Sequence, residues 1–192
     1  MADNRTLAEI RQAIDEIDPK IRELLMERLD CSGEVATAKL SSGDITIYRP
    51  DREEEILRRL GTGVPEERLA GYLAVVRKIM ETSRMYQYGI IYDKSDGIFE
   101  QLVDGIGIPE NASRVKIRIV RPDRPGSMSA ILSMIGDYGY DMAGMDLVGM
   151  DHEEGTADFV LTICGDLNTV LMRKLMFQLS MECMDFRILE VL

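Results

Sequence analysis

Apolar residues recur at alternating spacings of three and four along the start of the chain, the pattern of a long helix with one apolar seam. The seam positions are Leu7, Ile10, Ile14, Ile17, Ile21 and Leu24. Pro19 falls inside this stretch, but the seam keeps its phase across it, so we expect one kinked helix over residues 7–40. A helix that restarts at Pro19, with Asp18 as its cap, is the alternative.

Two further helical stretches follow. Pro50 begins the first, which carries acidic residues in its first turns and stops at Gly61. The second starts at Pro65, and its apolar stripe ends in two polar residues, Ser83 and Gln87. Both polar groups can be satisfied by the helix backbone, or they can face a site. We expect residues 1–90 to form a three-helix domain.

The pattern changes at Gly89. Residues 91–113 mix turn residues with one short amphipathic piece and are expected to be a linker. Beyond it, alternating apolar positions predict strands at residues 115–119, 142–150, 156–164 and 186–191, with helices at 127–138 and 169–179 between them. In the last helix, Val170, Leu171, Leu175 and Leu179 are expected to face inward. Residues 114–192 thus form a βαββαβ, ferredoxin-like domain, and the fold class of the chain is α + α/β.

Composition narrows the function. The net charge of -11 argues against a nucleic-acid or anionic-membrane surface. No apolar run approaches the ~20 residues of a membrane helix, and the N-terminus has no signal-peptide core. Cys31, Cys164 and Cys183 are interpreted as reduced core thiols of a cytoplasmic protein. His152 is the single histidine, so catalysis here should need no histidine base, metal or other cofactor.

Two cations lie on one face of the first helix. The seam continues to Arg28, and Lys39 follows eleven residues later, close to three turns. Their stems are roughly 16 Å apart along the axis, so the two side chains can hold one small dianion between them. The alternative is that both extend from the seam edge into water.

The polar residues that interrupt or flank the apolar patterns form one candidate site. They are Arg11, Arg28, Lys39, Arg52, Glu53, Ser83 and Gln87. Four are cations, one is an anion and two are neutral hydrogen-bonding groups, and none is an obvious nucleophile. Such a set suits a small, multiply charged anion that is held and reshaped without covalent attack.

The helical stretches resemble the all-helical chorismate mutases. The matching segments are LAEIRQAIDEID, LLMERLDCSGEVATAKL, IYRPDREEEIL and IMETSRMYQ, in order over residues 7–88. The resemblance implies an intertwined homodimer with shared sites and chorismate as substrate. It also implies that Arg11, Arg28 and Arg52 bind the two carboxylates and that Ser83 is a further substrate-binding residue. In the same family, the positions of Lys39 and Gln87 donate to the ether oxygen, and that of Glu53 meets the ring hydroxyl. Arg49 is a departure, because some members carry an aspartate there.

Residues 114–192 resemble an ACT domain, on strand order and the segment DRPGSMSAIL. The resemblance implies an aromatic amino-acid effector at Asp123, Pro125, Gly126 and Ser127, where helix N-terminal amides can hold a carboxylate. A purely structural or dimerising domain is the alternative. For the whole chain, we expect a regulated chorismate mutase that makes prephenate for phenylalanine and tyrosine synthesis. An isochorismate pyruvate-lyase and a non-catalytic amino-acid-sensing subunit are the rivals.

Overall fold

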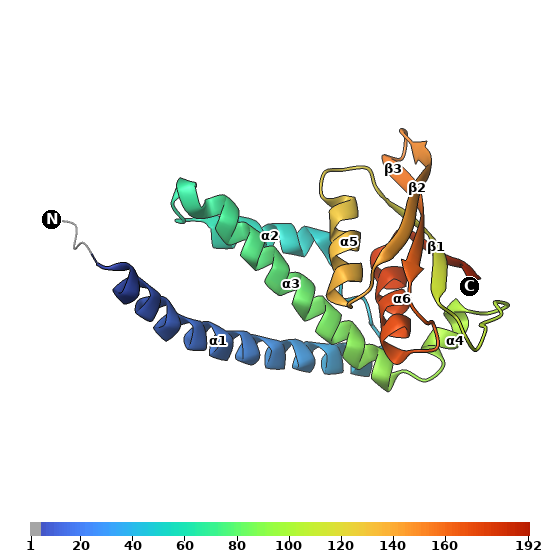
Figure 1. The fold of residues 1–192 in the computed structure, drawn as a ribbon, viewed down its shortest axis with the longest axis horizontal. Helices are drawn as coiled ribbons and strands as arrows, with labels where there is room; N and C mark the ends of the chain where they lie inside the picture. The colour runs from blue at the N-terminus through green and yellow to red at the C-terminus, as the bar shows by residue number, and fades with distance from the viewer. Residues whose placement is uncertain (1–4) are drawn as a thin grey trace.

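The computed structural model describes residues 5–192, which form a helical half and a sheet half (Figure 1). The helical half consists of α1 (Leu7–Ser42), α2 (Pro50–Gly61) and α3 (Glu66–Lys94). Both α1 and α2 pack on α3. The N-terminal part of α1 extends away from the rest of the chain (Figure 1).

Helix α1 is one continuous helix through Pro19, as the unbroken seam predicts. A capping box begins it, in which the amide of Glu9 donates to Thr6 Oγ1 and the amide of Thr6 donates to Glu9 Oε2. Gly43 ends it in the left-handed conformation, with φ of 74°, and its amide donates to the carbonyl of Leu40. The alternative with a restart at Pro19 is therefore wrong.

Helix α3 continues past Gly89 to Lys94, although the sequence pattern changes at this glycine. The cause is burial of the following turn. Tyr88 and Ile91 are buried together with Ala36 of α1 and Phe177 of the sheet half. This tertiary packing outweighs the low helix propensity of one glycine, which is about 1 kcal/mol.

The sheet half has the expected βαββαβ order. After the short helix α4 (Ile98–Leu102) come β1 (Arg114–Pro122), α5 (Ser127–Asp137), β2 (Met142–Asp151), β3 (Thr156–Cys164), α6 (Val170–Glu182) and β4 (Asp185–Val191). The strands form one antiparallel sheet in the order β2-β3-β1-β4. The residues of β1 alternate between buried and partly exposed along its length. Its buried positions, such as Ile117 opposite Leu161, form the core with α5 and α6.

Two expectations about burial need correction. Val170 and Leu171 are exposed, because the buried stripe of α6 begins at Met172 and continues through Leu175 and Leu179. The helix also ends three residues later than expected, at Glu182. Cys31 is exposed on α1 rather than a core thiol, whereas Cys164 and Cys183 are partly buried, and all three thiols are free.

Among residues 5–192, no helix is both long and apolar enough to cross a membrane. The same residues contain no group of three or more acidic, cysteine or histidine side chains arranged to hold a metal ion.

Candidate active site

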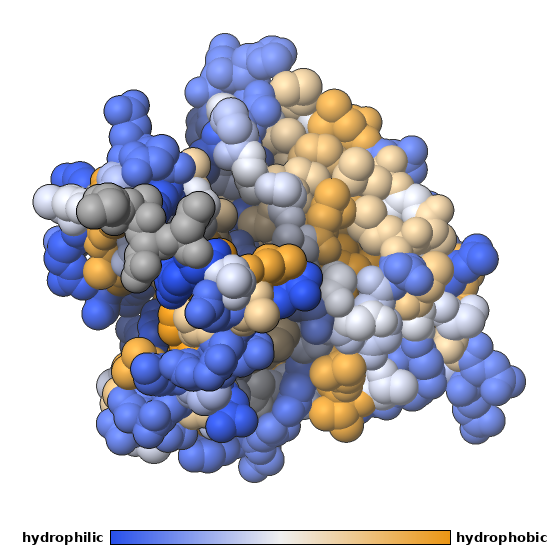
Figure 2. Space-filling model, turned by 60° about the vertical axis from the view of Figure 1, so that its left-hand side comes forward, coloured by the Kyte–Doolittle hydropathy of each residue, from blue (hydrophilic) through white to orange (hydrophobic). Residues whose placement is uncertain are grey.

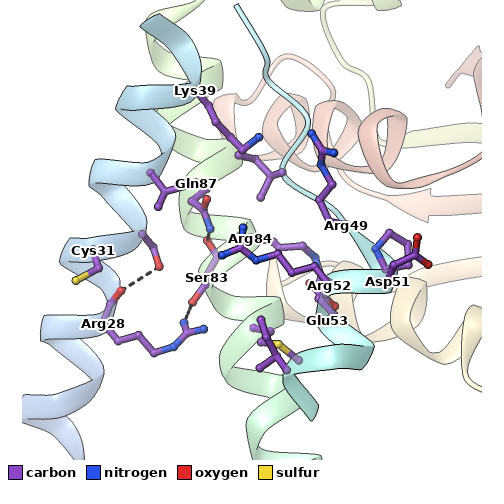
Figure 3. A pocket seen from close by; sticks show the side chains of 16 residues that line it. Arg28, Cys31, Lys39, Arg49, Asp51, Arg52, Glu53, Ser83, Arg84 and Gln87 are labelled. Atoms are coloured by element: carbon purple, nitrogen blue, oxygen red, sulfur yellow. Dashed lines mark hydrogen bonds and ion pairs between the residues drawn. The ribbon is translucent and has the colours of Figure 1, made fainter. Parts of the chain in front are cut away.

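A cleft of about 840 Å³ lies between α1, the start of α2 and α3 (Figure 3). Six of the seven site residues expected from the sequence line it: Arg28, Lys39, Arg52, Glu53, Ser83 and Gln87. The six come from three helices, and up to 59 positions separate them in the sequence. Arg11 is the exception: it does not line the cleft, and it is exposed on the N-terminal part of α1.

Arg28 and Lys39 lie toward opposite ends of the cleft, with Ser83 and Gln87 between them (Figure 3). Arg28 donates through Nη1 to Ser83 Oγ, which ties α1 to α3. Ser83 in turn donates to the carbonyl of Ile79, one turn earlier on α3. The guanidinium is therefore positioned by a buried hydroxyl that is itself fixed by the helix backbone.

Gln87 donates through Nε2 to the carbonyl of Ser83, at 3.1 Å. Ser83 and Gln87 thus both donate to backbone carbonyls of α3, as expected if the helix backbone satisfies them. The same two side chains also line the cleft. Because a primary amide has two N–H groups, Gln87 keeps a second donor for another partner.

Lys39 Nζ lies 3.0 Å from Asp44 Oδ2, in the loop after α1. Arg49 Nη2 lies at the same distance from this oxygen, so the Asp44 carboxylate pairs with two cations at one end of the cleft. Asp44 accepts hydrogen bonds from Lys39 and from the amide of Thr46, and these bonds hold the pKa of Asp44 well below its usual value. Arg49 therefore adds a positive charge to the cleft wall.

Glu53, in the first turn of α2, makes an ion pair with Nη1 of Arg84 on α3. Burial raises the pKa of Glu53, and the neighbouring Arg84 only partly offsets this effect. Arg84 also stacks over the ring of Tyr48, at 4.8 Å from its centroid. Its Nε donates to Glu182 Oε1 of the sheet half at 2.9 Å.

Sequence reasoning missed Arg84 and Glu182. Arg84 directly follows Ser83, off the apolar stripe of α3, where an arginine normally faces water. Its buried partner Glu182 is 98 positions away, beyond the expected end of the last helix. A prediction that the last helix extends to residue 182 would have placed Glu182 on it. The contact between Glu182 and Arg84 is visible only in the folded structure.

The expected effector residues form the turn before α5. Asp123, Pro125 and Gly126 are exposed, whereas Ser127 is buried. Gly126 has φ of 84°, which favours glycine. The amide of Ser127 donates to the carbonyl of Arg124, so a carboxylate bound there would have to displace this bond.

Comparison with known proteins gives the family of the helical half. Residues 10–88 match the sequence model of the family described as chorismate mutase type II. One similar protein is the bifunctional chorismate mutase/prephenate dehydratase of Pseudomonas aeruginosa, 39% identical over 64 residues, or 31% of this chain and 18% of the relative. Another is the chorismate mutase of Methanocaldococcus jannaschii, 48% identical over 54 residues, or 28% of this chain and 54% of the relative. No solved structure matches the chain.

The helical half therefore carries a chorismate mutase type II domain at residues 10–88. The match ends at Tyr88, one turn and a half before α3 does. The matched parts are little more than half of one relative and less than a fifth of the other.

Proposed function

We propose that the chain is a chorismate mutase that converts chorismate to prephenate in the synthesis of aromatic amino acids. One observation carries the proposal: two helices of a chorismate mutase type II domain, α1 and α3, bring Arg28, Lys39 and Gln87 to one cleft. The reaction has one substrate, and a carbon–oxygen bond breaks as a carbon–carbon bond forms. The protein must fold the dianion compactly and stabilise the charge that develops on the ether oxygen.

The side chains of the cleft suit these tasks. Arg28 and Arg52 can bind the two carboxylates of the substrate, with Ser83 fixing Arg28. Lys39 and the second N–H of Gln87 can donate to the ether oxygen, which gains negative charge in the transition state. Donors of this kind, already in place before the reaction, can each contribute several kcal/mol. Glu53, as a carboxylate, can accept from the ring hydroxyl.

The apolar seam of α1 supports an intertwined homodimer. Its six apolar residues from Leu7 to Leu24 are between 40% and 64% exposed, and Figure 2, with the N-terminal side forward, shows hydrophobic patches on the surface beside hydrophilic ones. Burying one such side chain fully is worth about 1.5–3 kcal/mol. A second α1 packed around a two-fold axis would cover the seam, and would carry its Arg11 to the cleft of this chain.

We also propose that the sheet half senses an aromatic amino acid at Asp123–Ser127, in the manner of an ACT domain. The turn contacts the helical half, since Arg124 Nη1 lies 3.3 Å from Glu54 Oε1. The free thiols agree with a reducing compartment, the cytoplasm, as the place of action.

Product analysis tests the activity. The purified chain should form prephenate from chorismate without added metal or cofactor, and the rate should respond to phenylalanine or tyrosine. Release of pyruvate from isochorismate, without prephenate formation from chorismate, would make the chain a pyruvate-lyase instead. Binding of an aromatic amino acid without turnover of either substrate would make it a sensing subunit.

A further inference from the structure

A buried polar network joins the cleft to the sheet half. Arg84 lies between Glu53 in the cleft and Glu182 at the end of α6, and its side chain is 8% exposed. On the sheet side, Gln178 Nε2 donates to the same oxygen of Glu182 at 2.8 Å. Tyr138, the C-cap residue of α5, donates to Gln178 Oε1 at 2.9 Å. Glu53, Glu182 and Gln178 therefore each have a hydrogen-bond partner from another part of the fold.

The backbone of Glu182 is fixed as well. Arg121 of β1 donates through Nη1 to its carbonyl, and through Nε to Ser127 Oγ at 3.3 Å. The side-chain and main-chain oxygens of Glu182 are therefore bound to two different arginines, one from each half of the chain. Its side chain is 3% exposed, so water does not compete effectively for either bond.

Glu182 restrains Arg84 in the position where Arg84 contacts Glu53. The guanidinium is planar, and it uses Nη1 for Glu53 and Nε for Glu182 at the same time. The ring of Tyr48 covers its face. A lysine at this position keeps the charge but cannot make two such bonds in a fixed geometry.

We propose that Arg84 is a positioning residue for Glu53, and that Glu182 of the sheet half anchors it, so the second domain completes the active site. The inference rests on the proposed mutase function, because it assigns Glu53 the ring hydroxyl of the substrate. It adds that the helical half alone does not contain a fully ordered site. Misplacement of a reacting or binding group by about 1 Å can lower the rate roughly 100-fold.

The first test compares Arg84→Lys and Glu182→Gln with Glu190→Gln, which alters an exposed acid on β4. We expect kcat to fall roughly 10- to 100-fold in the first two variants with little change in KM, because the cations that bind the carboxylates are untouched. Glu190→Gln should match the unaltered chain. Unchanged kcat in Arg84→Lys and Glu182→Gln would overturn the proposal.

A double variant separates positioning from stability. Arg84→Met combined with Glu182→Met removes both charges of the most buried ion pair, so neither is left unpaired in the interior, and Glu53, whose side chain is 24% exposed, keeps contact with water. The double variant should unfold at a temperature close to that of the unaltered chain and still show the reduced kcat. Recovery of kcat together with stability would mean that the pair serves only to hold the fold, and would overturn the proposal.

A measurement without substrate keeps this test independent of the activity. The ionisable groups around Glu53 are Arg84 and Glu81 of α3, Glu182 of α6, Arg28 and Lys39 of α1, and Arg52 of α2. Arg84 lowers the pKa of Glu53 and Glu182 raises it. In carbon-13 NMR titrations assigned with Glu53→Gln, the Glu53 carboxyl should therefore titrate at higher pH in Arg84→Met than in the unaltered chain.

The two failures are distinguishable. If the unaltered chain forms no prephenate, the proposed function fails, whatever the titrations give. If it does form prephenate but Glu53 does not titrate at higher pH in Arg84→Met, the contact does not act on Glu53 and the positioning role is excluded.

Discussion

Lys39 Nζ lies 3.0 Å from Asp44 Oδ2, so the cation proposed to reach the ether oxygen is held by a carboxylate at one end of the cleft. The ammonium has three N–H donors, and one carboxylate does not exhaust them. Asp44 can therefore orient Lys39 and still leave a donor for the substrate. The side chain of Lys39 is 22% exposed, which limits the screening of its charge by water.

Loss of either α1 cation should abolish most of the activity. We expect Lys39→Ala and Arg28→Ala each to lower kcat/KM by at least ~100-fold, the scale of losing one transition-state donor. Arg22→Ala, which removes an exposed cation elsewhere on α1, is the matched control and should be near normal. Circular dichroism should show the same helix content in all three. A near-normal rate in Lys39→Ala or Arg28→Ala would remove the proposed site.

Arg11 should act on the site of the partner subunit. It is seventeen residues from Arg28, roughly 25 Å along α1, too far for one small substrate to touch both. Arg11→Ala and Lys39→Ala should each be nearly inactive alone. In a mixed dimer both defects fall in one site and the other is intact, so unfolding and refolding the mixture should restore about a quarter of normal activity. No recovery in proven heterodimers would contradict a shared site.

Gln87 should give a donor that does not titrate near neutrality. An amide keeps its protons, so kcat/KM need not fall between about pH 6 and 8, whereas a glutamate there would have to be protonated to donate. A Gln87→Glu variant should be most active at acid pH. We expect Glu53 to set the acid limit of the unaltered chain, because burial raises its pKa and its carboxylate form is the proposed acceptor. Rates measured across pH would show a steep neutral titration if another group governed the step.

Phenylalanine or tyrosine should bind the sheet half and change the mutase rate. The turn Asp123–Ser127 reaches the helical half directly through Arg124 and Glu54. An indirect route runs from Ser127 through Arg121 to Glu182, which contacts Arg84 of α3. A typical coupling free energy is ~1–3 kcal/mol. Calorimetry on the whole chain measures the binding. Gly126→Val should weaken it, because φ is 84° there, whereas Gly136→Ala in α5 should not. No binding at millimolar levels would favour a structural role.

Phe177 of α6 should stabilise the helical half. It is 2% exposed, and its ring meets Tyr88 edge-on at 5.8 Å. We expect Phe177→Ala to lower the free energy of unfolding by about 3–5 kcal/mol. Leu171→Ala, on the exposed side of the same helix, should change it by less than about 0.5 kcal/mol. Chemical denaturation followed by circular dichroism measures both.

The elements were predictable because their periodicities are long and clean. The seam of α1 and the alternation of β1 are local patterns, and they give both halves of the fold and six residues of the cleft. What the sequence could not give depends on contacts between distant segments. Gly89 is helical because Ile91 is buried against Phe177. Arg84 is a buried residue because Glu182 meets it, and no local spacing encodes that meeting.

The continuity of α3 from Glu66 to Lys94 has a consequence for dissecting the chain. The family match stops at Tyr88, so a truncation made there would cut the helix and remove Ile91 and Phe177 from the cluster that covers Ala36. The excised fragment would expose an apolar surface and leave Arg84 without one of its two carboxylates. We therefore expect that the matched segment does not fold on its own in this protein, and that the two halves melt in a single cooperative transition.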